Sequence, residues 1–131
     1  FVVVLDAGHG GKDPGAVGSK RQNREKDINL SIVLEVGKLL SAHNKDIEII
    51  YTRETDKFVE LGQRARIANK AKANLFISVH TNAVPKNARK ARGVQSYTLT
   101  LNTAESNHKK EKRENEKYSV KNALQSGDFA V

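Results

Sequence analysis

The first seventeen residues constrain the fold of this chain more than any other stretch. They read FVVVLDAGHGGKDPGAV: an apolar, β-branched run, then Asp6, then a loop that holds four glycines and one histidine, His9. Such a run predicts a buried strand that ends at Asp6. Clustered glycines indicate a backbone that adopts positive φ or passes close to another group. The stretch therefore predicts a strand that carries His9 into a tight loop shaped for a bound partner.

Helices and strands are predicted to alternate after this loop. Apolar residues recur at three- and four-residue steps over residues 28–40 and 59–73, as on the buried stripe of an amphipathic helix. Short apolar runs over residues 47–52 and 74–80 predict a second and a third strand. The alternation indicates an α/β fold, a twisted, mostly parallel sheet with helices on both faces, in a single domain. Arg64 and Arg66 flank the stripe of the second helix and are expected to face solvent.

The last third of the chain is more polar. Residues 94–101 alternate polar and apolar side chains, which predicts a strand that is wet on one side and lies near a sheet edge. Residues 102–127 form a charge-rich segment in which Glu105 and Lys109 stand at helical i,i+4 spacing. This spacing gives slight support to a surface helix.

Composition excludes several kinds of site. The 131 residues include no cysteine, so disulfides and thiolate sites are ruled out, and any metal must be held by His, Asp and Glu. No apolar stretch approaches the roughly 18–20 residues of a membrane-spanning helix, so a soluble domain is expected. The net charge of +8 favours an anionic partner. With only four Phe and three Tyr to stack on bases, we expect no nucleic acid.

Three residues have the chemistry and the predicted positions of a metal site. His9 and His80 each stand at the end of an apolar strand, and parallel strands bring such positions to one edge of the sheet. Glu25 lies at, or just before, the first turn of the first helix. Two histidines and a carboxylate can hold zinc with a fourth position open for water or substrate. Structural histidines and a glutamate favoured by the helix dipole are the alternative, which spacing alone leaves open.

Weaker candidates surround these three residues. Asp6 is placed to orient a histidine ligand, although ending a strand is the commoner role of an aspartate. Asn82 is placed to hold the loop around His80 or to contact substrate, with a turn-forming asparagine as the alternative. Arg53 and Arg64 can meet peptide carboxylates, but by default we expect them to be solvated or to form structural ion pairs. His43 and His108 stand in polar contexts and are expected to be surface residues.

Several linked motifs resemble one known family. DAGHGGKDPGAVG is followed by a glutamate before an amphipathic helix, then by TRETDKFVELGQRARIANKAKANLFISVHTNA and by GVQSYTL. Over residues 2–101, in this order and with fitting gaps, the chain resembles the zinc-dependent N-acetylmuramoyl-L-alanine amidases of bacterial cell-wall turnover, in their type 3 catalytic domain.

The resemblance implies roles for individual residues. His9, Glu25 and His80 correspond to the ligands of Zn²⁺, and the implied reaction is hydrolysis of the amide between the lactyl group of N-acetylmuramic acid and L-alanine of the stem peptide. The general base of the family, a glutamate on a late strand in a stretch like VELGF, is not found in this chain. The letters VELG at residues 59–62 precede the third strand, so Glu60 is not assigned. We therefore expect residues 1–131 to form an amidase-like catalytic domain that lacks its C-terminal end.

The resemblance also implies a setting. Peptidoglycan or muropeptides are the expected partners, with an unknown regulatory protein as a further one, and the expected location is periplasmic, or secreted and associated with the cell wall. Two alternatives stay open. One is a zinc-containing muropeptide-binding module without turnover, and the other is a basic polymer-binding protein.

Overall fold

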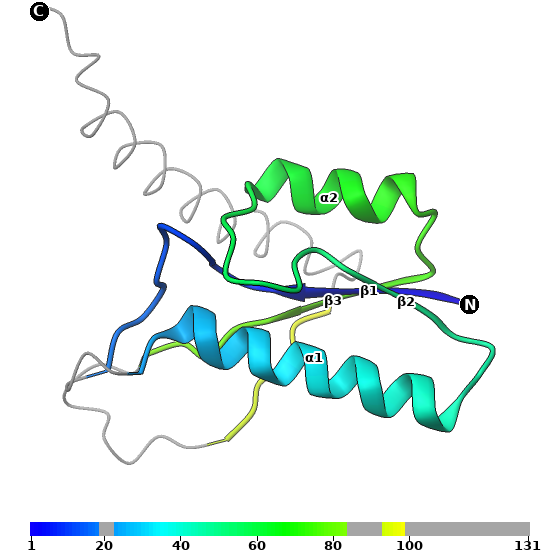
Figure 1. Cartoon of the computed structure of the whole chain (residues 1–131), viewed down its shortest axis with the longest axis horizontal. Coiled ribbons are helices and arrows are strands. Elements are labelled where there is room, and N and C mark those ends of the chain that lie inside the picture. The colour runs from blue at the N-terminus through cyan, green and yellow to red at the C-terminus, as the bar shows by residue number, and fades with distance from the viewer. Residues whose placement is uncertain (19–22, 84–92, 99–131) are drawn as a thin grey trace, which may run out of the picture. The chain divides into compact units, whose positions relative to one another are not determined.

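The structure, a computed structural model, describes residues 1–18, 23–83 and 93–98. The chain divides into two compact units, Phe1–Lys90 and Ala91–Val131. The first unit has the predicted α/β alternation of strands and helices (Figure 1). Its elements are β1 (Val2–Ala7), α1 (Glu25–His43), β2 (Glu48–Tyr51), α2 (Leu61–Lys70) and β3 (Leu75–Val79). In the part of the chain that is described, no helix has the length and apolar character needed to cross a membrane.

β1 is the central strand of a parallel sheet with the order β2-β1-β3. It pairs Leu5 with Tyr51 of β2 and Ala7 with Val79 of β3. The apolar residues of β1 are almost wholly buried because the strand has a neighbour on each side and a helix on each face. The prediction that Asp6 ends this strand is wrong, since β1 continues to Ala7 and Asp6 is a buried residue within it.

α1 and α2 lie on opposite faces of the sheet, as predicted (Figure 1). The connection from β1 to β2 runs to one side of β1, and the connection from β2 to β3 runs back past it. Because βαβ crossovers are right-handed, connections in opposite directions place their helices on opposite faces. Because β1 and β3 pair in parallel, their carboxyl ends are neighbours, at the kind of edge where α/β sheets bind ligands.

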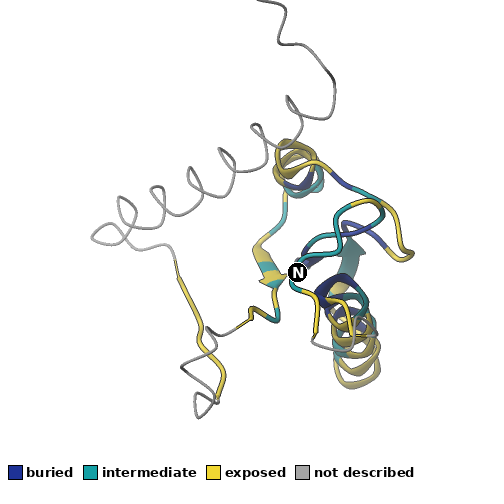
Figure 2. Cartoon of the chain, turned by 90° about the vertical axis from the view of Figure 1, so that its left-hand side faces the viewer, coloured by how far each residue is buried: buried dark blue, intermediate teal, exposed yellow. Residues whose placement is uncertain are grey.

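The core lies between α1 and the sheet. Val3, Leu5 and Ala7 of β1 pack with Val33 of α1, and partly buried aliphatic residues from the neighbouring strands surround them. The exposed residues of α1 lie on the side away from the sheet (Figure 2). At the edge of the described sheet β3 is less covered than its apolar sequence predicts, and Phe76 is 42% exposed.

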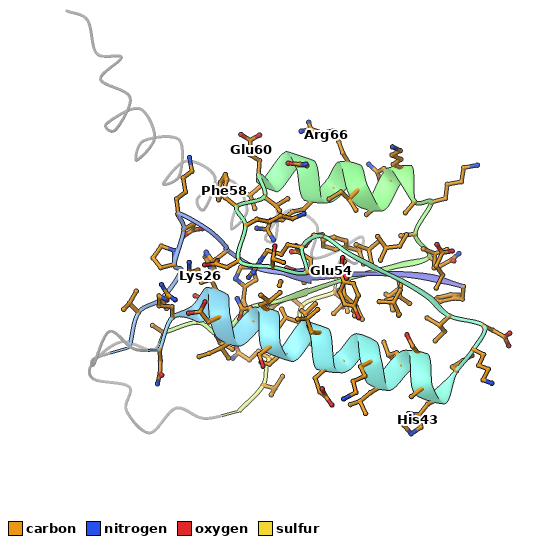
Figure 3. The ribbon with its side chains drawn as sticks, viewed as in Figure 1. Lys26, His43, Glu54, Phe58, Glu60 and Arg66 are labelled. Carbon is orange, nitrogen blue, oxygen red and sulfur yellow. The ribbon has the colours of Figure 1, made fainter. Side chains whose placement is uncertain are left out.

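The prediction for the faces of α2 is wrong. Leu61 is half exposed and Ala65 is exposed, whereas Arg64, which was expected to face solvent, is the buried residue of this helix. The guanidinium of Arg64 is buried because it pairs with the carboxylate of Asp6 and with backbone carbonyls. Arg66 does face solvent, as predicted (Figure 3).

In the second unit, the structure describes residues 93–98. These residues form no strand, and Val94 and Tyr97 are 99% and 62% exposed. The strand predicted over residues 94–101 is thus absent from its described part. Residues 99–101, the charge-rich segment at 102–127 and His108 lie outside the described residues.

Candidate metal centre

His9 lies in the glycine loop two residues past β1. Its φ of 63° is in the left-handed region, which a side chain other than glycine seldom adopts. Two contacts hold it there. The carbonyl oxygen of His9 accepts a hydrogen bond of 2.9 Å from Nη2 of Arg64, and Nδ1 of the ring lies 2.7 Å from Oδ2 of Asp13. The ring therefore turns its other nitrogen, Nε2, toward Glu25, whose Oε1 is 3.3 Å away.

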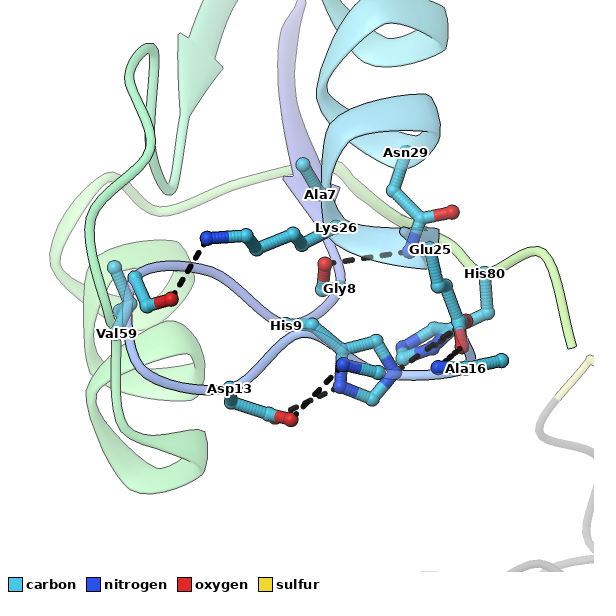
Figure 4. Close-up of polar contacts among 12 residues, drawn as sticks. Ala7, Gly8, His9, Asp13, Ala16, Glu25, Lys26, Asn29, Val59 and His80 are labelled. Atoms are coloured by element: carbon cyan, nitrogen blue, oxygen red, sulfur yellow. Dashed lines mark hydrogen bonds and ion pairs between the residues drawn. The ribbon is translucent and has the colours of Figure 1, made fainter. Parts of the chain in front are cut away.

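Glu25 is the first residue of α1, and its side chain is 4% exposed. Oε1 lies 3.1 Å from Nδ1 of His80 and accepts a hydrogen bond of 3.0 Å from the amide of Thr81. Oε2 accepts a hydrogen bond of 2.9 Å from the amide of Ala16 (Figure 4). The carboxylate is thus fixed between the two loops that follow β1 and β3.

His80 follows β3 directly. Because Ala7 pairs with Val79, the ring of His80 stands beside Gly8, and the rings of His9 and His80 meet edge to face with centroids 4.9 Å apart. A Cβ atom on Gly8 would overlap the ring of His80. The absence of a side chain at Gly8 is therefore what lets the two loops close around the histidines.

The donor atoms of His9, Glu25 and His80 lie within 4.8 Å of one another. Two imidazole nitrogens and a carboxylate oxygen are a donor set that binds first-row divalent metals. The three residues come from the end of β1, the start of α1 and the end of β3, as predicted. The site is partly open, since the side chain of His80 is 36% exposed. The structure thus brings together His9, Glu25 and His80, the three residues predicted from the sequence, in a geometry that can hold a metal ion.

The charges of the three residues depend on one another. The hydrogen bond to Glu25 raises the pKa of His9 to about 8; burial opposes this effect, and Asp13 adds to it. Burial by itself would raise the pKa of Glu25, but hydrogen bonds from His80, His9 and the Ala16 amide outweigh it and hold this pKa well below its usual range. Glu25 is therefore ionised across the physiological range and supplies the negative charge that a cation needs.

Two further cations fix the backbone of the glycine loop. Arg53 is 1% exposed and donates to the carbonyls of Ala7 and Gly8 at 2.9 and 3.1 Å, and also to the carbonyl of Lys26 at 2.8 Å. Nζ of Lys26 in turn donates to the Gly11 carbonyl at 2.8 Å and pairs with Asp56. Arg53 is thus a structural residue, as its default interpretation held.

The weaker candidates fall in different places. The carboxylate of Asp6 accepts hydrogen bonds from Arg64, Thr52 and Ser78, which join α2 to the ends of β2 and β3. Asp6 therefore reaches His9 through Arg64, which also binds the His9 carbonyl, while the carboxylate on the ring of His9 is that of Asp13. Asn82 is an exposed residue of the loop after β3, and its role stays a prediction.

Two residues outside the metal site behave as expected. His43 is exposed at the end of α1, where its Nδ1 lies 2.8 Å from the Leu39 carbonyl oxygen. Glu60 is exposed at the N-cap of α2 and projects away from the sheet (Figure 3).

Besides Lys26, sequence reasoning missed two residues that support the site. One is Asp13, in the DPG turn four residues after His9. The other is Asn29, one turn after Glu25 in α1 and wholly buried, whose amide donates to the Gly8 carbonyl and whose oxygen accepts a hydrogen bond from the hydroxyl of Thr81. A polar residue one turn from a predicted ligand, on the buried face of an apolar helix, was the signal for Asn29.

Parallel strands that end in two imidazoles, with a carboxylate at the start of the first helix, define the class: an α/β protein with a candidate metal centre at the carboxyl edge of its sheet. The family model for N-acetylmuramoyl-L-alanine amidase matches residues 3–128. The chain belongs to this family.

Individual relatives agree with the family match. The endolysin of Bacillus phage SPP1 is 45% identical over 105 residues, which cover 80% of this chain and 36% of the phage protein. The solved catalytic domain of CwlV, an N-acetylmuramoyl-L-alanine amidase from Bacillus (Paenibacillus) polymyxa var. colistinus, is 48% identical, with a TM-score of 0.63 over 66% of this chain and 48% of that one.

A third relative, the CwlD amidase of Clostridioides difficile, was solved in complex with the GerS lipoprotein. It is 34% identical, with a TM-score of 0.53 over 66% of this chain and 51% of that one. The chain spans less than half the length of the curated relatives it matches first.

Proposed function

We propose that this chain is a zinc-dependent hydrolase of peptidoglycan, which cleaves the amide between the lactyl group of N-acetylmuramic acid and L-alanine of the stem peptide. The observation that carries the proposal is the convergence of His9, Glu25 and His80, whose donor atoms lie within 4.8 Å of one another. Membership of the amidase family supports the bond and the substrate class.

The donor set favours zinc among the metals that proteins hold. Two imidazoles suit zinc, copper, iron and nickel, whereas calcium and magnesium prefer sites made wholly of oxygen. Two histidines and one glutamate also form the ligand set of several zinc hydrolases, which keep a fourth position for water or substrate. When bound in such a site, zinc lowers the pKa of a water ligand to near neutrality and polarises a carbonyl group.

The residues of this chain supply the binding and the orientation. Glu25, held by the amides of Ala16 and Thr81, keeps one oxygen facing both histidines and balances part of the charge of the cation. His80 is partly exposed, so one side of the site is open to a large substrate. No described carboxylate is assigned here as the general base, and Glu60, exposed at the N-cap of α2, is not proposed for this role.

The test is mass spectrometry of a muramyl-peptide substrate incubated with the zinc-loaded chain, beside a chelated control. We expect a free stem peptide and a free lactyl sugar only in the presence of zinc. An intact substrate beside stoichiometric bound zinc would overturn hydrolysis and favour the muropeptide-binding module. Binding that is sensitive to salt but indifferent to zinc would favour the basic polymer-binding protein instead.

A matched pair of histidine variants tests the ligand assignment. His80→Ala removes a proposed ligand, whereas His43→Ala removes an exposed histidine at the far end of α1. We expect His80→Ala to lose tight zinc binding and turnover, and His43→Ala to keep both. Equal zinc content in the two purified variants would contradict the assignment of His80.

The proposed function agrees with the expected location, which is periplasmic, or secreted and associated with the cell wall. A regulatory protein partner stays a prediction. It is supported by analogy with the CwlD neighbour, which was solved with a lipoprotein bound to it.

A further inference from the structure

We propose that Asp13 is a positioning residue that fixes the tautomer and the orientation of His9 for metal binding. The inference rests on the proposed function, because it takes His9 to be a ligand. Oδ2 of Asp13 lies 2.7 Å from Nδ1 of His9, the shortest contact that this ring makes in the described part of the chain.

A neutral imidazole carries one proton and one lone pair on its two nitrogens. Asp13 is an acceptor, so it favours the proton on Nδ1 and leaves the lone pair on Nε2. Nε2 is the nitrogen that faces Oε1 of Glu25, at 3.3 Å. Asp13 therefore prepares the one nitrogen of His9 that points into the site.

The carboxylate of Asp13 is itself fixed by the loop. Its Oδ1 accepts a hydrogen bond of 3.1 Å from the amide of Gly15. Its backbone exchanges two hydrogen bonds with Gly10, of 2.9 and 3.0 Å, which close the turn from Gly10 to Asp13. Both carboxylate oxygens thus have partners within the loop, which suits a residue that orients a ligand and does not itself reach the metal.

Asp13 does a different job from Asp6 and Arg64. Those two residues act on the backbone of the loop, since Arg64 binds the carbonyl oxygens of Ala7 and His9. Asp13 acts on the ring. Because His9 lies outside any helix or strand, the orientation of its ring depends on side-chain contacts, and the polar contact with Asp13 is shorter than the one with Glu25.

The experiment measures zinc affinity by competition with a chromophoric chelator, at fixed pH and ionic strength, in four forms of the full chain. These forms are the wild type, Asp13→Ala, Asp13→Asn and Asp27→Asn. Asp27 is the charge-matched control, a partly exposed carboxylate in the first turn of α1 that pairs with Arg24. Loss of its charge changes the general electrostatics without touching His9.

We expect Asp13→Ala to weaken zinc binding by about 10–100-fold, the usual effect of losing a partner of a ligating histidine. Asp13→Asn keeps an oxygen that can accept the Nδ1 proton, so we expect it to recover part of the loss. Asp27→Asn should change the affinity by no more than about twofold, because this carboxylate pairs with Arg24 and partly exposed charges are screened by salt. Wild-type affinity in Asp13→Ala, or the same loss in Asp27→Asn, would overturn the proposal.

A second readout does not depend on affinity. In zinc-loaded protein labelled with ¹⁵N at histidine, we expect a protected Nδ1 proton on His9 that exchanges faster in Asp13→Asn than in the wild type. If Asp13→Ala fails to fold, this comparison decides, and equal exchange overturns the proposal. A wild type that binds no zinc at all would instead overturn the proposed function.

Discussion

Single residues at this site show how buried charge serves geometry. Arg53, Arg64 and Lys26 are each about 95–99% buried, and each is paired with a carboxylate or with backbone carbonyls. Burial of a charge is costly unless such partners replace water. These cations bind the carbonyls of residues 7–9 and 11, so they fix the backbone path of the glycine loop and the position of the His9 backbone.

The ion pair between Arg64 and Asp6 has a predictable cost of removal. Arg64→Gln leaves the buried carboxylate of Asp6 without its cation, so we expect the free energy of unfolding to fall by about 3–5 kcal/mol in urea denaturation. The matched control is Arg66→Gln, an exposed arginine of the same helix, with an expected change within about 0.5 kcal/mol. Similar small losses in both variants would mean that the pair contributes little.

His9 makes the stability of the zinc-free protein depend on pH. Its pKa is about 8 in the folded state against 6.5 for the free side chain, so protonation favours folding. The contribution, about 2 kcal/mol, is present below pH 6.5 and is lost as the pH rises through 8. We expect the free energy of unfolding, measured with a chelator present, to fall over this interval.

The control for this pH dependence is His9→Asn. Asparagine tolerates positive φ better than most residues, so the loop keeps its backbone while the titrating group is lost. We expect the fall between pH 6.5 and 8 to disappear in this variant. An unchanged fall would assign the pH dependence to another group.

At the scale of elements, the site depends on how closely two loops and a helix start approach each other. Glu25 opens α1, and its carboxylate binds the amides of Ala16 in one loop and of Thr81 in the other. Gly15 lies against the side chains of both His9 and Glu25. A Cβ atom on Gly15 would stand 2.6 Å from Cδ2 of His9 and 2.8 Å from Oε2 of Glu25. The close approach of the loops and the helix therefore leaves no room for a side chain at Gly8 or Gly15.

Gly8→Ala tests this close approach. The added methyl group overlaps the ring of His80, so we expect the ring to move and zinc affinity to fall by about tenfold or more. Gly62→Ala is the control, because Gly62 lies in α2 and its nearest neighbour would be 3.7 Å away. It should leave zinc affinity unchanged and stabilise the helix by about 0.5–1 kcal/mol. Unchanged zinc affinity in Gly8→Ala would show that the two loops can move apart enough to accommodate the methyl group.

At the scale of the whole molecule, the three proposed ligands join segments far apart in the sequence. His9, Glu25 and His80 follow β1, open α1 and follow β3, so the complete donor set exists only in the folded chain. Binding to the folded state alone stabilises it by mass action. Zinc at 100 times its dissociation constant should therefore raise the free energy of unfolding by about 2.7 kcal/mol.

This stabilisation is checked by thermal or urea unfolding with and without zinc. His80→Ala should remove the increase, and His43→Ala should retain it, because His43 is an exposed residue remote from the donor set. An increase that survives in His80→Ala would place the bound zinc elsewhere.

Much of the architecture was predictable from local pattern. The apolar run of β1, the helical spacing after Glu25 and the short runs of β2 and β3 predict the order of elements and the parallel sheet. That order predicts the shared edge for His9, Glu25 and His80, which the structure brings within 4.8 Å; their role as zinc ligands stays a proposal. The alternating pattern at 94–101 misled, since the described residues 94–98 form no strand.

Residue type and short-range spacing are enough to identify the apolar runs, the turns and the side chains with metal-binding chemistry. The pairing of Asp6 with Arg64, the burial of Arg64 and the positive φ of His9 beside Asp13 arise from long-range contacts of the folded chain. Asp6 and Arg64 are 58 positions apart, and no local pattern encodes their contact. A polar side chain is buried only when a partner replaces water, and the fold brings that partner.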